Sequence, residues 1–304
     1  MTTLLADIGG THARFALLQG SEATPPVTYK LDEFPDIATA IRQYLAKQSQ
    51  PEAAVLAVAG PVVENRVTLT NRGWVVDGAA LSTLLGIPRI RIVNDFAALA
   101  WALPHFGPED LLLLGGTAGE PGEPMAVLGP GTGLGVAAFL PPDRVLASEG
   151  GHASLAAQAL EEAAVIATVR AEHGHVSAER LISGQGIEAL YAALGGEKGT
   201  SAPEVTARAL AGGDAISGKT LALFCALLGS FAGDVALMFG ARGGVFIGGG
   251  ICPRFPDVLA RSEFRARFEA KGRFQAWLAP VPTWLILRPD PAMLGLAALA
   301  RQHG

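Results

Sequence analysis

An Asp-x-Gly-Gly-Thr segment close to the start of the chain places the strongest constraint on the fold. Residues 3–8 and 14–19 on either side of it are apolar runs of strand composition, joined by the short turn Gly-Gly-Thr-His-Ala. Two such runs with a glycine-containing turn between them are typical of a β-hairpin. The sheet is therefore expected to open with an antiparallel pair, which excludes a fold made only of repeated strand–helix–strand units.

The residues that follow the hairpin alternate between strand and helix signals. Strands are expected at residues 27–31, 53–59, 66–70 and 89–93, and helices at residues 36–47, 79–85 and 95–103. Pro104 ends this pattern, because proline cannot continue a helix. A length of 304 residues, at roughly 150 residues per domain, suggests two domains. We therefore predict a small α/β domain at residues 1–104 and a large α/β domain at residues 105–289.

The second half of the chain shows the same mixture of signals. Strands are expected at residues 111–114, 125–129, 136–140, 145–147, 245–247 and 283–287. Helices are expected at residues 156–173, 185–194, 203–211, 215–239 and 292–301, with two short helices between residues 255 and 278. Ser201 and Glu204 have the spacing of a capping box at the start of the helix 203–211.

Composition argues against several classes of protein. The net charge of −5 does not mark a nucleic-acid binder. The mean hydropathy of +0.34 raises the question of a membrane span, but glycines and prolines interrupt the longest uncharged stretch, residues 124–142. The first residues lack the basic region of a signal peptide, so we expect a cytoplasmic protein with no membrane segment. Cys225 and Cys252 belong to no Cys/His cluster, and no structural zinc is expected.

Two glycine-rich segments are candidate phosphate loops, although a purely structural turn is the alternative for each. In Asp7-Ile8-Gly9-Gly10-Thr11, glycines at a hairpin tip allow backbone N–H groups to converge on an anion, and the preceding carboxylate suits a hydrated Mg²⁺. Residues 129–135, Gly-Pro-Gly-Thr-Gly-Leu-Gly, lie between two strand signals, and Thr132 offers a hydroxyl. They also resemble a dinucleotide-binding fingerprint, but Pro141-Pro142 prevents the helix that this fingerprint requires.

Two further glycine clusters are ambiguous. Residues 243–251 contain a strand signal that ends in three glycines, which would let a flat ligand such as adenine approach the backbone; tight strand packing is the simpler explanation. Residues 213–220 match the G-x-x-x-x-G-K-T pattern of a P-loop. A P-loop needs a strand before it, and residues 203–211 have helical periodicity instead. Lys219 is therefore expected at the exposed start of an ordinary helix.

Polar residues follow two of the predicted strands. Asn94 and Asp95 lie where a strand ends and a helix begins, so Asp95 could act as a general base, or either residue could cap the helix. Glu149 and His152 flank two glycines after the strand 145–147, where they could hold a polyol. Glu179 stands in Ser-Ala-Glu-Arg and, taken alone, is explained by electrostatics in the first turn of a helix.

Together these segments resemble one family. The chain is similar to the bacterial ATP-dependent glucokinases without a zinc motif, within the actin, Hsp70 and hexokinase superfamily, at residues 5–14, 93–96, 129–135, 149–152, 175–180 and 243–251. The segments occur in the family's order and span nearly the whole chain. The resemblance implies an actin-like ATPase (ribonuclease H-like) fold of two α/β domains around a cleft, with residues 290–304 completing the small domain.

The resemblance also implies a role for each residue. ATP would be bound by Ala6, Asp7, Ile8, Gly9, Gly10, Thr11, Gly131, Thr132, Gly133, Gly249 and Gly250. Glucose would be held by Asn94, Asp95, Glu149, His152 and Glu179. Asp95 would accept the proton of the glucose 6-hydroxyl as it attacks the γ-phosphorus, and Asp7 would contact Mg²⁺ through water.

The implied activity is that of a glucokinase, a transferase that converts glucose and ATP to glucose 6-phosphate and ADP in the first step of glycolysis. A cytoplasmic homodimer is implied, with Mg²⁺ accompanying ATP and with no nucleic-acid or membrane partner. Two alternatives remain open. One is a kinase for another hexose, such as fructose, mannose or an N-acetylated sugar, and the other is a non-enzymatic, sugar-responsive or actin-like ATPase module.

Overall fold

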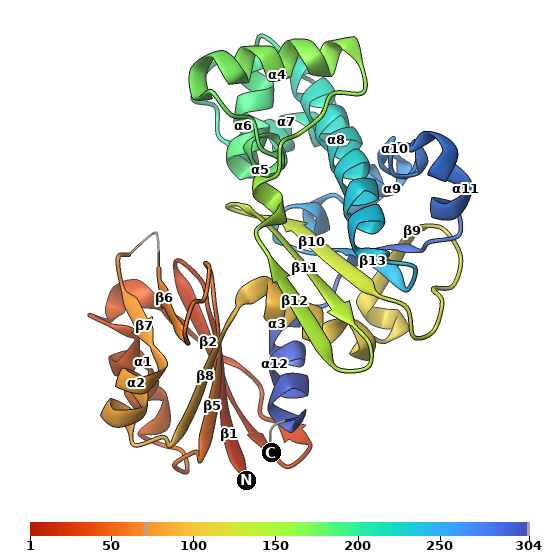
Figure 1. Ribbon diagram of the computed structural model, residues 1–304. Coiled ribbons are helices and arrows are strands. Elements are labelled where there is room, and N and C mark those ends of the chain that lie inside the picture. Colours follow the sequence, from red (N-terminus) through yellow and green to blue (C-terminus); the bar gives the residue numbers. More distant parts are fainter. Residues whose placement is uncertain (70–71, 303–304) are drawn as a thin grey trace. The chain divides into compact units, whose positions relative to one another are not determined.

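The computed structural model describes residues 1–69 and 72–302. The chain divides into two compact units, one made of Met1–Phe106 and Arg288–Gly304 and the other of Gly107–Leu287 (Figure 1). Each unit has its own sheet and its own hydrophobic core.

A six-stranded sheet forms the centre of the first unit. Its strands are β1 (Thr2–Ile8), β2 (His12–Gln19), β3 (Glu22–Ala23), β4 (Val27–Lys30), β5 (Ala53–Val58) and β8 (Arg89–Asn94). Their order is β3-β2-β1-β5-β8, with β4 also paired to β2. β1 and β2 are antiparallel, whereas β1, β5 and β8 run parallel. The predicted opening hairpin and the mixed sheet are therefore confirmed.

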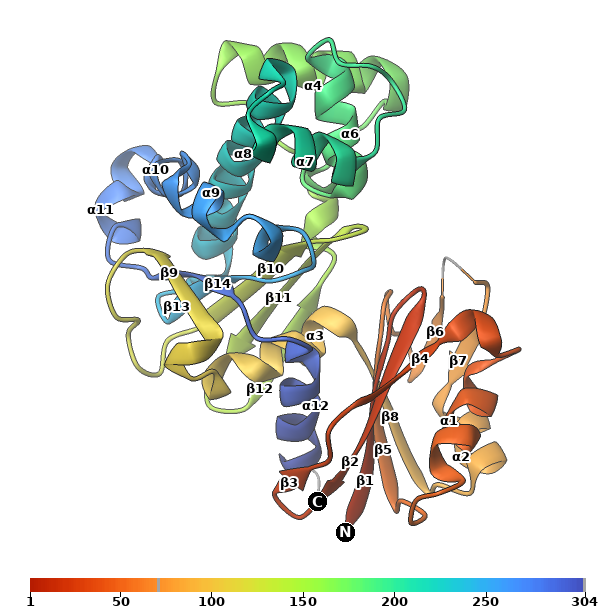
Figure 2. The same ribbon diagram turned by 180° about the vertical axis from the view of Figure 1, so that it is seen from behind.

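Helices cover both faces of this sheet (Figures 1 and 2). α1 (Ile37–Leu45) and α2 (Gly78–Leu85) lie on one face, and α3 (Asp95–Ala102) and α12 (Pro291–Gln302) lie on the other. α12 comes from the far end of the sequence and packs closely on α3. At Gly295 the two helices approach so closely that a Cβ atom would lie only 1.8 Å from the carbonyl oxygen of Ala98. The last described helix is thus an integral part of the first unit.

A small two-stranded sheet of β6 (Arg66–Thr68) and β7 (Val75–Asp77) completes the first unit. The sequence predicts a strand at residues 66–70, of which residue 70 lies outside the described residues. β7 was not predicted, because three residues are too few to show a clear alternation of apolar and polar side chains.

The second unit is built on another six-stranded sheet. Its strands are β9 (Leu111–Gly115), β10 (Met125–Pro130), β11 (Leu134–Leu140), β12 (Arg144–Ser148), β13 (Gly244–Ile247) and β14 (Thr283–Ile286). Their order is β12-β11-β10-β13-β14-β9. β10 and β11 form an antiparallel hairpin, and β10, β13 and β14 run parallel. Residues 134–140 are a strand rather than a helix, so the rejection of a dinucleotide fingerprint is confirmed.

One long helix, α8 (Ala215–Phe239), runs through the second unit. The others are α4 (Leu160–His173), α5 (Ala178–Leu181), α6 (Gly184–Ala193), α7 (Ala202–Ala211), α9 (Pro256–Arg261), α10 (Phe264–Glu269) and α11 (Gln275–Leu278). Of these, α5, α6, α7 and α10 pack against α8. α8 is long and apolar enough to cross a membrane by length and composition alone, but 72% of its most apolar window is buried inside the protein. At Gly229 and Gly233, α8 lies directly against the backbone of α10.

Two predictions in this unit are wrong in their details. α4 begins at Leu160 rather than at residue 156, because the backbone before it pairs with a later segment: Leu155 N–H donates to Val176 O at 3.0 Å. The predicted capping box is absent, since the Ser201 side chain makes no capping hydrogen bond. The Glu188 carboxylate accepts the Ala202 N–H at 3.0 Å instead, a contact that local spacing cannot reveal.

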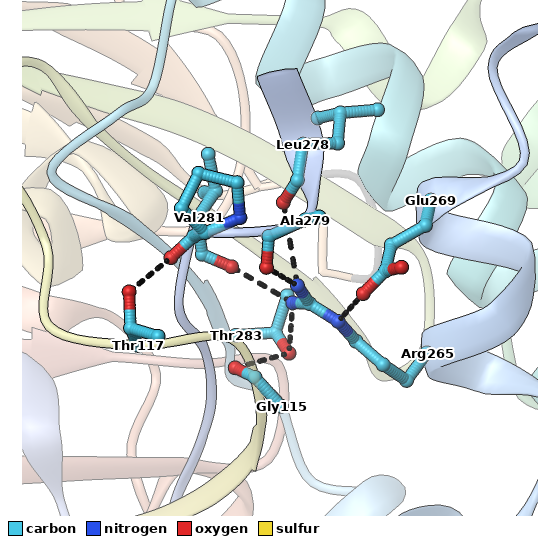
Figure 3. A network of polar contacts seen from close by, with 9 residues as sticks. Gly115, Thr117, Arg265, Glu269, Leu278, Ala279, Val281 and Thr283 are labelled. Atoms are coloured by element: carbon cyan, nitrogen blue, oxygen red, sulfur yellow. Dashed lines mark hydrogen bonds and ion pairs between the residues drawn. The ribbon is translucent and has the colours of Figure 1, made fainter. Parts of the chain in front are cut away.

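A partly buried guanidinium joins three segments of the second unit (Figure 3). Arg265, on α10, donates to the carbonyl oxygens of Val281 and Ala279 at 2.8 and 2.7 Å and forms an ion pair with Glu269 at 2.6 Å. It also donates to the Thr283 hydroxyl on β14 at 3.1 Å. These bonds satisfy backbone carbonyls that no regular element uses, and they fix the entry into β14.

Candidate active site

In the first unit, the glycine turn and the Asn-Asp pair lie at the same edge of the sheet. The parallel register aligns Ile8 with Val58 and Val58 with Asn94, so the strands β1, β5 and β8 end together. The turn that follows β1 is closed by a hydrogen bond from Gly9 N–H to His12 O at 3.0 Å. Ligands of open α/β sheets bind at the carboxyl ends of parallel strands, and this edge carries the predicted phosphate loop.

Asp7, just before the glycine turn, belongs to a chain of three charged side chains. Its carboxylate lies 3.3 Å from Arg14 Nη1, and Arg14 Nε lies 2.6 Å from the carboxylate of Asp290. Burial raises the pKa of Asp7 in spite of the opposing effect of the Arg14 guanidinium. Asp290 stands immediately before α12 with φ +50, an uncommon conformation for a residue other than glycine. Arg14 thus joins the start of α12 to the glycine turn.

Arg72 holds the glycine turn from another direction. Its Nε donates to the carbonyl oxygen of Gly10 at 2.7 Å, and its terminal nitrogen pairs with Asp32. The guanidinium also lies over the ring of Trp74, 5.3 Å from its centroid, and only 16% of the Arg72 side chain is exposed. Arg72 is therefore fixed on three sides next to the turn.

Asn94 caps the helix that Asp95 begins. The Asn94 Oδ1 atom accepts the N–H groups of Phe96 and Ala97 at 2.9 and 3.1 Å, and its amide nitrogen donates to Gly60 O at 3.1 Å. One Asp95 oxygen accepts the Phe96 N–H at 2.9 Å, so the carboxylate stands at the N-terminus of α3. Asn94 is therefore a helix cap, as one of the two interpretations from sequence expected. The cap fixes the backbone at Asp95 and leaves a catalytic role for Asp95 open.

In the second unit, residues 130–134 form the other glycine hairpin. Gly131 N–H donates to Gly133 O at 2.8 Å within the turn, and Gly131 O accepts the Gly184 N–H at 2.9 Å. The Leu134 N–H donates to Glu179 Oε2 at 2.8 Å. The start of α6 and the first turn of α5 therefore both support the hairpin, and Glu179 has a tertiary partner beyond the helix electrostatics considered from sequence.

The Glu149–His152 segment forms a 3₁₀ turn that packs on the same hairpin. His152 N–H donates to Glu149 O at 3.0 Å, and both side chains are exposed. A Cβ atom at Gly151 would lie 2.0 Å from Leu134 O, so only glycine fits where the turn meets the hairpin. His152 Nδ1 lies 3.9 Å from Glu179 Oε1, which brings two of the predicted sugar ligands together.

The glycine cluster at residues 248–250 packs against the hairpin of residues 130–134. Gly248 N–H donates to Leu128 O at 2.8 Å, and a Cβ atom at Gly249 would lie 2.4 Å from Pro130 O. Gly249 also has φ +78, whereas a Cβ atom at Gly250 would meet nothing within 4 Å. The tight-packing interpretation therefore explains Gly249, and Gly250 is left exposed beside it.

The P-loop match at residues 213–220 is accidental. The segment before it is helix α7, and Gly218, Lys219 and Thr220 lie within α8 itself. Lys219 pairs with Glu161 on α4. The Gly218 N–H already donates to Asp214 O at 3.0 Å, and a P-loop requires a strand where α7 stands. The rejection of this motif is therefore confirmed.

Some residues at these sites were not singled out as functional from the sequence. They are Arg14, Arg72 and Asp290 in the first unit and Gly184 in the second. Arg72 and Gly10 are far apart in sequence, and no local pattern connects them. Among residues 1–69 and 72–302, no three His, Cys, Asp or Glu side chains gather as a metal site.

This fold and these sites define a sugar kinase of the actin-like ATPase class. A solved glucokinase from an Antarctic psychrotroph superposes with a TM-score of 0.91 at 36% identity, covering 99% of both chains. The glucokinase family model matches residues 4–303. The glucokinase of Paramagnetospirillum magneticum is 46% identical over 97% of this chain and 96% of its own, and that of Chromobacterium violaceum is 44% identical over 99% and 89%. The chain belongs to the glucokinase family, and the actin-like fold that the sequence predicts is confirmed.

Proposed function

We propose that the protein transfers the γ-phosphoryl group of ATP to the 6-hydroxyl of glucose, as the first step of glycolysis. The observation that carries this proposal is the shared edge of β1, β5 and β8, where the glycine turn follows β1 and the Asn94–Asp95 pair lies at the end of β8, with β5 between them. Kinases of this kind need a backbone cradle for phosphate and one carboxylate that orients the attacking hydroxyl. Family membership favours glucose as the sugar.

Asp95 is proposed as the general base. In the reaction a bond forms between the sugar O6 and the γ-phosphorus, the bond from the γ-phosphorus to the ADP oxygen breaks, and the O6 proton passes to the Asp95 carboxylate. Asn94 fixes the position of this carboxylate by capping α3. Most of the rate enhancement would come from such positioning together with stabilisation of charge on the phosphoryl group.

The two glycine hairpins are proposed to bind the phosphates of ATP. The first is the Ala6–Thr11 segment, comprising Ala6, Asp7, Ile8, Gly9, Gly10 and Thr11, and the second contains Gly131, Thr132 and Gly133. Gly249 and Gly250 are proposed to lie against the adenosine, with exposed Gly250 open to a ligand. Backbone N–H groups at glycine turns bind anions because no Cβ atom obstructs the approach.

Five polar side chains are proposed as the ligands of glucose: Asn94, Asp95, Glu149, His152 and Glu179. Each sugar hydroxyl can both donate and accept a hydrogen bond, so a set of carboxylates, an amide and an imidazole suits it. An analogue that lacks a hydroxyl would leave one of these groups without a partner, which disfavours its binding.

Asp7 fits a hydrated Mg²⁺ ion. It offers a carboxylate at the phosphate turn, but one of its oxygens already faces Arg14, so it suits an ion that keeps several waters and phosphate oxygens. Mg²⁺ bound with ATP would neutralise charge on the transferred phosphoryl group. A cytoplasmic homodimer, with the two units acting as the small and large domains, completes the proposal.

ATP consumption with and without glucose tests this function. ADP release is measured in a coupled assay with Mg²⁺, without sugar and with glucose, fructose, mannose and N-acetylglucosamine in turn. We expect turnover that depends on sugar and is fastest with glucose. Faster turnover of another sugar would assign a different hexose kinase, and ATP hydrolysis independent of sugar would overturn the kinase assignment.

A further inference from the structure

Glu179 contacts two different parts of the second unit with its two carboxylate oxygens. Oε2 accepts the Leu134 N–H at 2.8 Å, at the end of the phosphate hairpin. Oε1 faces His152 Nδ1 at 3.9 Å, on the side of the proposed sugar ligands. The Glu179 side chain is 32% exposed, so one face remains accessible to a ligand.

The Glu179 carboxylate is packed tightly against the hairpin. A Cβ atom at Gly133 would lie 2.5 Å from Glu179 Oε2, so any larger residue there would displace the carboxylate. The carbonyl oxygen of Leu134 is in turn covered by the backbone of Gly151, in the turn that carries His152. The backbone of Leu134 is thus contacted by sugar-binding segments at both its N–H and its C=O group.

The segment that carries Glu179 is itself firmly placed. The Ala178 N–H donates to Ala153 O at 2.8 Å, which joins α5 to the turn containing His152. At the start of α6, the Gly184 N–H donates to Gly131 O at 2.9 Å. The stretch from α5 to the start of α6 therefore holds the hairpin at two points, one near each of its ends. Figure 1 shows α5 and α6 beside the end of β10 and β11.

We propose that Glu179 is a positioning residue that couples sugar binding to nucleotide binding. It holds the hairpin of residues 130–134 in the conformation that binds phosphate, and a sugar hydroxyl on Oε1 orders the carboxylate further. ATP then binds to a hairpin that is already ordered, so the affinity of the protein for ATP rises. The inference rests on the proposed glucose kinase function, but its structural half, the support of the hairpin, does not depend on sugar.

Linkage makes the proposal measurable. If glucose raises the affinity for nucleotide by some factor, nucleotide raises the affinity for glucose by the same factor. Coupling between two sites is typically about 5–150-fold, and we expect at least about fivefold for the wild type. The coupling should disappear when Glu179 can no longer reach Leu134.

The experiment measures the dissociation constant of a non-hydrolysable ATP analogue with Mg²⁺, without sugar and with saturating glucose. Glu179→Ala removes the brace and the sugar contact, so sugar-free nucleotide affinity should fall about tenfold, as loss of a hydrogen bond to a charged group predicts, and the effect of glucose should vanish. Glu179→Gln keeps an acceptor for the Leu134 N–H, so its sugar-free affinity should stay within about twofold of wild type while glucose binding weakens.

Two further variants keep the test decisive. Glu188→Ala is the matched control, since Glu188 also accepts a backbone N–H, from Ala202 at 3.0 Å, but does not contact the hairpin; it should behave as wild type. Gly133→Ala keeps the Glu179 residue but displaces its carboxylate. Because Gly133 is itself a proposed phosphate ligand, this variant is judged by the ratio of nucleotide affinities with and without glucose, which should fall to about one if Glu179→Ala does not fold.

The outcomes separate this inference from the proposed function. Wild-type sugar-free affinity together with a full glucose effect in Glu179→Ala or in Gly133→Ala would overturn the inference. So would a wild type whose nucleotide affinity does not respond to bound glucose. If the wild type binds no glucose at all, the proposed function fails, and with it the coupling; the sugar-free arm would still decide whether Glu179 supports the hairpin.

Discussion

The turn of the first glycine hairpin is held by a cation, and the end of the second is held by a carboxylate. Arg72 Nε donates to Gly10 O at 2.7 Å, whereas Glu179 Oε2 accepts the Leu134 N–H at 2.8 Å. A brace on a carbonyl uses none of the N–H groups of the turn, while a brace on an N–H uses one of them. The cation adds positive charge beside a site proposed for phosphate, and the carboxylate adds negative charge.

This difference suggests a division of labour. The first hairpin is suited to bind the phosphates, because its brace occupies no N–H group of the turn, and the charge of Arg72 is balanced by Asp32. The second hairpin gains geometry from Glu179 at an electrostatic cost, and the same carboxylate faces a proposed sugar ligand. Its brace is therefore better explained by communication with the sugar than by phosphate affinity alone.

The largest expected effect concerns Asp95, which begins α3 at the same sheet edge as the first hairpin. Asp95→Ala should lower kcat by more than the ~10²–10⁴ typical of a lost general base, because the carboxylate also orients the hydroxyl. Glucose binding, measured by calorimetry, should remain detectable. Asp95→Asn, which keeps the shape but cannot take a proton, should lose kcat as well. Normal turnover in either variant would remove Asp95 from the mechanism.

The next effect concerns the glycines packed behind the second hairpin. Gly249→Ala should destabilise the protein by about 2 kcal/mol or more, because alanine at positive φ costs ~1–2 kcal/mol and its Cβ would also meet Pro130 O at 2.4 Å. Gly250→Ala, one residue further on, meets nothing within 4 Å and should change stability little. Chemical unfolding of both variants checks this pair. Equal stability of the two would mean that the backbone contact with Pro130 is readily relaxed.

Arg72 tests the brace of the first hairpin directly. Arg72→Ala should raise the KM for ATP about tenfold, as expected for a lost hydrogen bond from a charged group, with a smaller change in the KM for glucose. Arg66→Ala is a suitable control, because Arg66 is an exposed arginine of the same unit whose ion pair with Asp77 lies on β6 and β7. If Arg72→Ala changed both KM values equally, the brace would not be specific to the nucleotide.

The smallest expected effect is a pH dependence in the first unit. Partial desolvation, and secondarily the charge of Arg301, lowers the pKa of the exposed His105 below 6.5. A lowered histidine pKa means that stability is fully present above pH 6.5 and is lost as the pH falls toward the folded value. His105→Gln should therefore lose less stability than wild type between about pH 8 and about pH 5. If the free energy of unfolding fell equally with pH in the wild type and in His105→Gln, the titration of His105 would not contribute to stability.

The sequence predicted those parts of the fold that local signals determine. The hairpin at Gly9 and Gly10 and the helix 215–239 follow from glycine position and from apolar periodicity, and both are present. The three-residue strand β7 and the start of α4 could not be read in this way, since one is too short for a pattern and the other depends on pairing with residues 176–178.

The candidate site was predicted as a set of residues but not as a set of contacts. Asn94 and Asp95 follow a strand, so their place at the sheet edge could be inferred, whereas their individual roles came from family resemblance. The contacts of Glu179 with Leu134 and of Arg72 with Gly10 join residues far apart in sequence. Charged residues on short segments carry no periodic signal, and only the folded arrangement reveals their partners.

The place of α12 in the first unit affects the order in which the protein can be completed during synthesis. All residues of the second unit, Gly107–Leu287, leave the ribosome before α12 does. The first unit has to wait for the helix that packs at Gly295 and for Asp290, which holds Arg14 behind the glycine turn. Because domains generally fold as units during translation, the unit that begins the chain is the one finished last.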